Sequence, residues 1–165
     1  MNKNSEYSED VIVDLLNNAI KKLQEKDSKL LDKKFNINER TVTHRLAMYI
    51  AEEFPNFDVD CEYNRMALGK KEYIKKSINN LKQVEKRIKI DDVRAITVFP
   101  DIIVHNREYK EENLIVIEVK MEWKQNNLDF DYAKLNCYKN ELGYKFAVHL
   151  ILDSEKSILK FFNNE

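Results

Sequence analysis

Three charged residues stand at the ends of two strongly apolar segments, where charged side chains are unusual. Asp101 immediately precedes the apolar run 102–104, and Glu118 and Lys120 end the run that begins at residue 114. Residues two apart on a β-strand lie on the same face, about 6.5–7 Å from each other, so Glu118 and Lys120 are expected to share one face. Two carboxylates and an ammonium beside buried strands destabilise a fold unless they bind something.

Metal-assisted hydrolysis of a phosphodiester bond would use all three side chains. Asp101 and Glu118 offer the hard oxygen ligands that Mg²⁺ and Mn²⁺ prefer, and such a cation neutralises the phosphate and acidifies a bound water. Lys120 is expected to orient that water or to stabilise the negative charge that develops in the transition state. The residue types therefore predict single-step hydrolysis without a covalent intermediate.

Each of these residues also has a simpler interpretation. Glu118 and Lys120 can form a surface salt bridge at a strand end, and Asp101 after Pro100 can serve as a turn residue at the start of a strand. A D…ExK pattern alone also arises by chance in chains rich in Lys and Glu. Its position at the ends of two apolar strands favours the catalytic interpretation.

The apolar periodicity and the turn residues predict helices and strands that position these residues. The expected order is helix, helix, strand, helix, strand, strand, helix, strand, strand, over residues 9–24, 37–54, 59–64, 70–89, 98–105, 114–120, 129–142, 145–152 and 157–162. Strands 98–105 and 114–120 should form an antiparallel hairpin, because only a polar turn separates them. Pro55 and Gly143 are expected to end the helices before them.

Composition is typical of a globular protein, and residues 1–165 are expected to form one domain, because no linker rich in Ser, Gly or Pro divides them. The formal charge of −1 argues against a generally basic protein that coats nucleic acid. No apolar run approaches the roughly 20 residues of a membrane span, and the N-terminus lacks the features of a signal peptide, so we expect a cytoplasmic protein without a membrane partner. Cys61 and Cys137 belong to no CxxC motif, and the histidines show no spacing suited to Zn²⁺.

The most basic part of the chain lies between Gly69 and Arg94, where nine Lys and Arg residues stand against four Asp and Glu residues. Apolar residues recur at helical spacing in this segment, and Lys75, Lys82 and Lys86 fall on another face of the expected helix. A lysine-rich face can follow a phosphate backbone, although it is more often only solvated surface. These three lysines are therefore candidate nucleic-acid-binding residues.

Phe99-Pro100-Asp101, followed 17 positions after Asp101 by Glu118-Val119-Lys120, resembles the motif of the PD-(D/E)XK nucleases, the restriction-endonuclease-like superfamily. Within it the chain looks most similar to small bacterial stand-alone proteins of unknown function. The resemblance implies an α/β fold with an αβββαβ core over residues 41–152 and a central mixed sheet flanked by helices. The helix at 9–24 would be an extra N-terminal element, and the helix at 70–89 would be an insertion in the core.

The resemblance also implies further site residues. Val119, inside the ExK motif, joins the implied metal-binding residues. Glu39 matches a Glu on the helix before the sheet that often completes the metal site in the family. An equally supported alternative makes Glu39 part of a capping box with Asn36 at the helix start. Lys134 lies on the helix after the motif, which family members often turn toward nucleic acid.

These observations predict a metal-dependent, endonuclease-like phosphodiesterase that uses Mg²⁺ or Mn²⁺ and acts on nucleic acid, with DNA as the expected substrate. Its expected catalytic residues are Asp101, Glu118, Lys120 and Glu39. The alternative is a non-catalytic nucleic-acid-binding or assembly module that retains the nuclease fold. Because the net charge is near neutral, we expect the protein to bind nucleic acid together with a second subunit, as a homodimer, or as part of a larger defence or repair complex.

Overall fold

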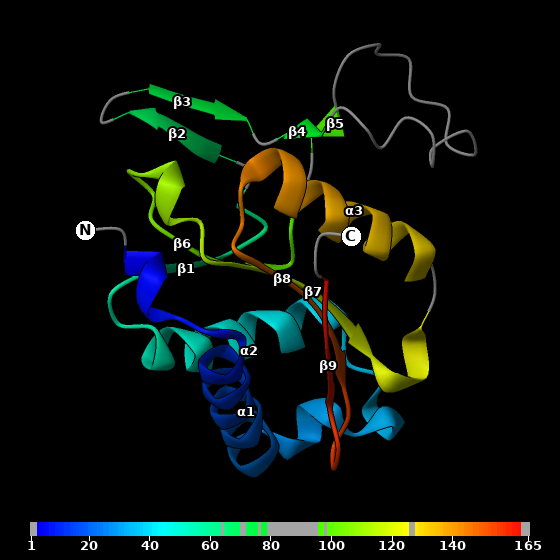
Figure 1. Ribbon diagram of the computed structural model, residues 1–165. Helices are drawn as coiled ribbons and strands as arrows, with labels where there is room; N and C mark the ends of the chain where they lie inside the picture. The colour runs from blue at the N-terminus through cyan, green and yellow to red at the C-terminus, as the bar shows by residue number, and fades with distance from the viewer. Residues whose placement is uncertain are drawn as a thin grey trace.

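A five-stranded mixed β-sheet forms the centre of the protein, and α-helices cover both of its faces (Figure 1). The computed structural model describes residues 3–63, 65–69, 72–75, 77–78, 96–97, 99–125 and 128–162. Within these residues the three α-helices are α1 (Glu9–Lys26), α2 (Glu39–Glu53) and α3 (Leu128–Leu142). The strands of the large sheet are β1 (Asp58–Cys61), β6 (Ile102–His105), β7 (Ile115–Met121), β8 (Phe146–Leu152) and β9 (Ile158–Phe161).

The shorter elements lie between these. Two small antiparallel pairs are formed by β2 (Arg65–Gly69) with β3 (Glu72–Lys75) and by β4 (Ser77–Ile78) with β5 (Ile96–Thr97). The 3₁₀ turns include η2 (Ser28–Leu31), η3 (Lys33–Phe35), η5 (Lys110–Glu112) and η6 (Glu122–Lys124), and η1 (Lys3–Glu6) precedes α1.

The order of strands in the large sheet is β1-β6-β7-β8-β9. β6 pairs antiparallel with both β1 and β7, so the predicted hairpin of β6 and β7 is confirmed. β8 lies parallel to β7, and the chain between them passes through α3, the connection that a parallel pair requires. β9 returns antiparallel to β8. The expected α/β class and the central mixed sheet are therefore confirmed.

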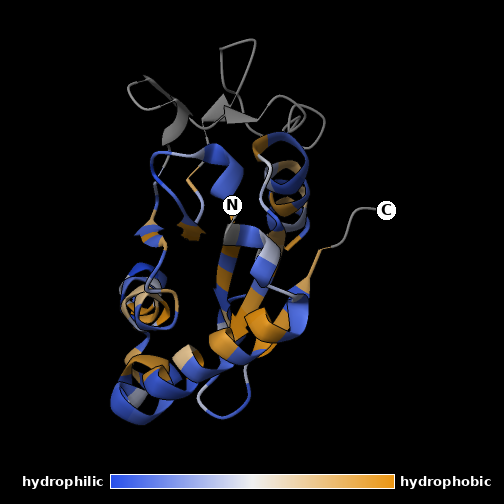
Figure 2. Cartoon of the chain, turned by 60° about the vertical axis from the view of Figure 1, so that its left-hand side comes forward, coloured by the Kyte–Doolittle hydropathy of each residue, from blue (hydrophilic) through white to orange (hydrophobic). Residues whose placement is uncertain are grey.

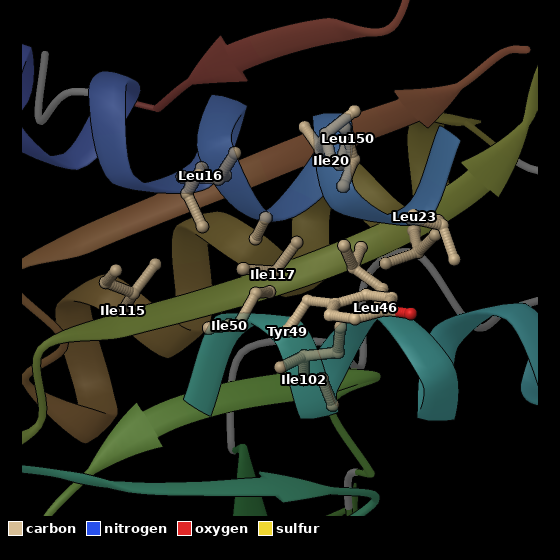
Figure 3. Packing of buried hydrophobic residues seen from close by; sticks show 14 of the residues in the cluster. Leu16, Ile20, Leu23, Leu46, Tyr49, Ile50, Ile102, Ile115, Ile117 and Leu150 are labelled. Carbon is tan, nitrogen blue, oxygen red and sulfur yellow. The ribbon is translucent and has the colours of Figure 1, made fainter. Parts of the chain in front are cut away.

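The main hydrophobic core lies between the sheet and the pair α1 and α2. Alternation along β7 and β8 sends every second side chain to this side, and these residues are Ile115, Ile117, Val119, Met121, Phe146, Val148, Leu150 and Leu152. Figure 3 shows Leu16, Ile20 and Leu46 of the helices directed at the strand residues. Hydrophobic residues gather along the strands of this sheet, whereas hydrophilic ones fill many of the turns (Figure 2).

A smaller core lies on the opposite face, under α3. Leu135, Tyr138 and Leu142 of this helix pack against Val116 and Ala147 of the sheet. The same face of β7 continues, after Val116, into Glu118 and Lys120, because residues two apart share a face. The packing of α3 thus brings its polar residues close to the charged end of β7.

Local signals determine where the helices begin and end. The Ser8 side chain accepts a hydrogen bond from Val11 N–H at the start of α1, and the Asn38 side chain accepts one from Arg40 N–H at the start of α2. Gly143 follows α3 with a φ of 72°, in the left-handed region that glycine adopts without strain. No helix among the described residues is long and apolar enough to cross a membrane.

The predicted helix at 70–89 is wrong where the structure describes it, because residues 72–75 and 77–78 are strands. Apolar residues four apart repeat on one face of a strand as well as on a helix, so the spacing of Ile74 and Ile78 does not discriminate between the two. Pairing of β3 with the preceding strand β2, and of β4 with the more distant β5, decides in favour of extended backbone. Lys75 ends β3, while Lys82 and Lys86 lie outside the described residues.

Two strands are shorter than predicted. β1 ends at Cys61 because Glu62 takes a φ of 51°, which breaks the extended backbone. β6 begins at Ile102 rather than at residue 98, since Pro100 has no N–H to donate to a neighbouring strand. Pro100 O instead accepts a hydrogen bond from Glu62 N–H at 3.0 Å.

Gly143→Ala should destabilise the protein by about 1 kcal/mol, because an L side chain at positive φ is strained. A Cβ at this position would meet nothing within 4 Å, so a loss of stability would report backbone conformation alone. Gly143→Asn is the matched control and should be affected less, since Asn tolerates left-handed φ. Chemical denaturation measures both values, and equal stability of the Ala variant and the wild type would contradict the conformational argument.

Candidate functional site

Asp101 and Glu118 are neighbours at the end of the β6–β7 hairpin. Ile102 pairs with Ile117, so the residue before Ile102 and the residue after Ile117 follow next in register. The Asp101 carboxylate accepts a hydrogen bond from Val119 N–H at 2.8 Å, which joins Asp101 directly to β7. Burial raises the pKa of Asp101, although the Val119 hydrogen bond acts in the opposite direction.

Glu118 is the most deeply buried acid of the site, with only 1% of its surface exposed. Its Oε2 lies 2.5 Å from Lys134 Nζ, and the buried Tyr138 hydroxyl interacts with the same carboxylate, which adds to the effect of burial in raising the pKa of Tyr138. Burial, followed by the negative charge of Asp101, raises the pKa of Glu118 to about 8, although Lys134 opposes the shift. Removing this carboxylate from water is thus only partly compensated by the protein.

Lys120 extends from β7 between acids that belong to two different helices. Its Nζ lies 3.3 Å from Asp131 Oδ2 of α3 and 3.6 Å from Glu39 Oε1 of α2. Burial lowers the pKa of Lys120, but Asp131 and Glu39 raise it, and the net shift is upward. Lys120 is therefore held as a cation at the end of the sheet.

Glu39 points toward the sheet and not back toward the start of its own helix. Its Oε2 accepts a hydrogen bond from Met121 N–H at 3.4 Å, and its negative charge raises the pKa of Asp101. The side chain that caps α2 is Asn38, through Arg40 N–H. The capping-box alternative for Glu39 is therefore wrong, because the carboxylate is engaged with β7.

Asp131 belongs to the site, although its position in the sequence did not single it out as a site residue. It is buried, and its Oδ1 lies 3.7 Å from Lys134 Nζ, one turn further along α3. The spacing of Asp131, Lys134, Leu135 and Tyr138 places them on one helical face, and this was the signal in the sequence that could have revealed Asp131. A charged pair on the apolar face of a helix needs partners, and here they come from β7.

Two further residues predicted to belong to the site are Val119 and Lys134, and both are buried or largely buried. The Val119 side chain is buried in the main core, so only its backbone can contribute to the site. Lys134 is largely buried against Glu118, and its pKa is lowered by burial but raised overall by Glu118 and Asp131. Its contact with nucleic acid stays a prediction.

Acidic side chains outnumber basic ones among the described residues of the site. The acids Glu39, Asp101, Glu118 and Asp131 stand against the two lysines Lys120 and Lys134. No group of three His, Cys, Asp or Glu side chains within the described ranges is arranged to hold a metal ion. Mg²⁺ is commonly held by only one or two carboxylates together with water and substrate phosphates. Asp101 and Glu118, two acids adjacent in register, fit such a site.

A cavity of about 390 Å³ opens beside these residues. Its lining comes from the start of α2, the end of β1 and residues 99 and 101, and it includes both Glu39 and Asp101. A second cavity of about 540 Å³ lies near the η2 and η3 turns and includes Glu122 and Trp123, which follow β7. Only the first cavity contains candidate metal-binding residues.

Two of the three histidines, His105 and His149, are buried. His149 is fully buried on β8, next to Glu118 in register, where its ring forms a T-shaped pair with Tyr132 at a centroid distance of 5.0 Å. His105 Nε2 lies 2.9 Å from Asp60 Oδ2. His44 is exposed and lines the cavity of 390 Å³.

Comparison with known proteins gives no family for this chain. No protein-family model, curated protein or solved structure matches it. The interpretation of the site therefore depends on its own geometry and chemistry.

In EDTA, the free energy of unfolding should decrease as pH rises from about 4.5 to about 8. In this range the unfolded chain has lost the Glu118 proton while the folded protein keeps it, so rising pH favours the unfolded state. One proton corresponds to a slope of at most about 1.4 kcal/mol per pH unit. Chemical denaturation at a series of pH values measures this slope.

Glu118→Gln should remove this contribution, because the amide does not ionise. Glu25→Gln is the control, since Glu25 is an exposed residue of α1 that forms a surface ion pair with Lys21. If the two variants show the same dependence on pH, Glu118 is not the buried group that titrates.

Proposed function

We propose that this protein is a metal-dependent nuclease of the PD-(D/E)XK type, which uses Mg²⁺ or Mn²⁺ to hydrolyse phosphodiester bonds of nucleic acid. The observation that carries the proposal is the juxtaposition of Asp101 and Glu118 at the end of one hairpin, with Lys120 beside them on β7. Two acids that repel each other in a buried position favour the binding of a cation.

The order of elements supports the same proposal. α2, β1, β6, β7, α3 and β8 follow the αβββαβ order of a restriction-endonuclease-like core, with three antiparallel strands and a fourth parallel to the third. α1 would precede this core, and β9 would follow it. The small pairs β2–β3 and β4–β5 lie between β1 and β6 and would be an insertion.

Each site residue has a role in this proposal. Asp101, Glu118 and the backbone of Val119 would hold the cation, and Glu39 would complete its environment from α2. The bound cation would supply positive charge to the phosphate and acidify a water. Lys120 would stabilise the negative charge of the transition state, since Asp131 and Glu39 keep it protonated.

One observation favours a second candidate, a nucleic-acid-binding or assembly module without catalysis. Lys134 Nζ lies 2.5 Å from Glu118 Oε2 and so supplies part of the positive charge that a metal would bring. A protein that keeps Lys134 there permanently would retain the fold and lose the chemistry. Metal-binding measurements separate the two candidates. A homodimer or a larger defence or repair complex, and DNA as the substrate, stay predictions.

Asp101→Asn should weaken Mg²⁺ binding and abolish cleavage together, because it removes a charged ligand. Lys120→Met should leave Mg²⁺ binding intact or stronger, since a nearby positive charge disappears, but should reduce cleavage by about 100-fold or more. Lys21→Met, on the exposed face of α1, is the control and should behave as wild type. Calorimetry with Mg²⁺ and cleavage of plasmid, linear and single-stranded substrates measure the two effects. Absence of divalent-metal binding by the wild type, or full cleavage by Lys120→Met, would contradict the catalytic assignment.

Glu39→Gln should lower Mg²⁺ affinity without unfolding the protein. The amide oxygen can still accept the Met121 N–H hydrogen bond, so the change removes charge and keeps the contact. Glu25→Gln is again the matched control. Unchanged Mg²⁺ affinity in Glu39→Gln would exclude Glu39 from the metal site and limit it to holding Lys120.

A further inference from the structure

The cavity of about 390 Å³ beside Asp101 has a lining that combines acids with an aromatic ring and a guanidinium. Glu39 and Asp101 belong to the candidate metal site, whereas Phe99 and Arg40 have no part in the metal chemistry proposed above. Small-molecule pockets have volumes of about 300–1,000 Å³, so this cavity lies near the lower limit of that range. Its size suits about one nucleotide and not a base pair.

Phe99 is the aromatic residue of this lining, and 52% of its surface is exposed. It stands two residues before Asp101, where the chain enters β6. Exposed aromatic rings in nucleic-acid-binding grooves can stack against nucleobases. Such stacking depends little on the nucleotide sequence, because every base has a π-face. Stacking on the Phe99 ring inside this cavity requires a nucleobase that is not paired with a second strand.

Arg40 lines the same cavity from the first turn of α2, and its side chain is 81% exposed. Its Nε lies 2.9 Å from Glu62 Oε1, which is also well exposed. Ion pairs between exposed groups contribute little stability, so Arg40 can exchange this carboxylate for a phosphate at small cost. The guanidinium is the side chain best suited to bidentate binding of phosphate.

The charge of the cavity lining determines whether a phosphate group can enter the cavity. Glu39, Glu62 and Asp101 outnumber Arg40 among the charged residues of the lining. A phosphate is therefore repelled until a divalent cation occupies the acids. The same cation would then draw the nucleotide into the cavity.

We propose that this cavity receives one unpaired nucleotide, with its base stacked on Phe99 and its phosphate between Arg40 and the metal held by Asp101. The preferred substrate is then single-stranded nucleic acid, or a single-stranded end, and not a continuous duplex. This inference rests on the proposed nuclease function, because the phosphate enters with the metal.

The test compares cleavage of one labelled oligonucleotide, single-stranded or annealed to its complement, by the full chain in Mg²⁺, with DNA and RNA versions as separate arms. The wild type should show a KM at least about 10-fold lower for the single strand. Phe99→Ala should raise this KM by about 5- to 150-fold, the equivalent of one lost stacking contact, with little change in kcat. Phe99→Trp should restore the affinity.

Phe35→Ala is the matched control, because Phe35 is 58% exposed and does not line the cavity. Arg40→Ala should raise KM for the single strand, whereas removal of an exposed lysine such as Lys21 should not. These changes in KM would support the single-strand site.

The outcomes also separate this inference from the proposed function. Equal cleavage of single strand and duplex, with Phe99→Ala indistinguishable from Phe35→Ala, would overturn the single-strand site and leave the nuclease intact. Binding of the single strand that depends on Phe99 but needs no Mg²⁺, without cleavage, would overturn the nuclease and the metal-dependent entry. Neither binding nor cleavage by the wild type would overturn both.

Discussion

The rest of the site depends on burial of the Glu118 carboxylate in the central sheet. A carboxylate that is removed from water on an apolar strand must be paired or protonated, or must bind a cation. Lys134 provides the pairing, and Asp101 increases the need for it by bringing a second negative charge across the hairpin. α3 therefore has to dock in one particular position along the sheet, because another would leave both Glu118 and Lys134 without partners.

The ion pairs of the site form a chain of alternating charge. Glu118 contacts Lys134, Lys134 contacts Asp131, Asp131 contacts Lys120, and Lys120 contacts Glu39. The chain begins under α3 and ends at the first turn of α2, so it connects the helices on both faces through the end of β7. A change in charge at one member would alter the electrostatic environment of all five. Metal affinity and local packing are coupled in this arrangement, so both metal binding and folding stability should be measured for any variant of one of these residues.

The sequence predicted the parts of this fold that depend on local periodicity. Residues 114–120 alternate on a buried strand and residues 129–142 keep an apolar stripe, so β7 and α3 were found with nearly correct bounds. Strands 72–75 and 77–78 were missed because spacing within one segment carries no information about pairing: 72–75 pairs with the neighbouring strand β2, and 77–78 pairs with the more distant β5. Asp131 was missed because its burial results from the docking of α3 on β7, which a single-helix pattern does not encode. The direction of the Glu39 side chain likewise follows from its contact with Met121, across the interface between α2 and the sheet.

The pairing of β1 with β6 has a consequence for the variability of this fold. These two strands are neighbours in the sheet, although residues 62–101 lie between them. The entropy of closing such a loop grows only with the logarithm of its length, so a doubling costs only about 0.6 kcal/mol. The segment can therefore lengthen, shorten or change its composition over evolution with little thermodynamic penalty to the sheet. Because its last residues are Phe99, Pro100 and Asp101, changes at this end of the segment occur directly beside the candidate site, where they can alter which molecules reach it while the scaffold stays the same.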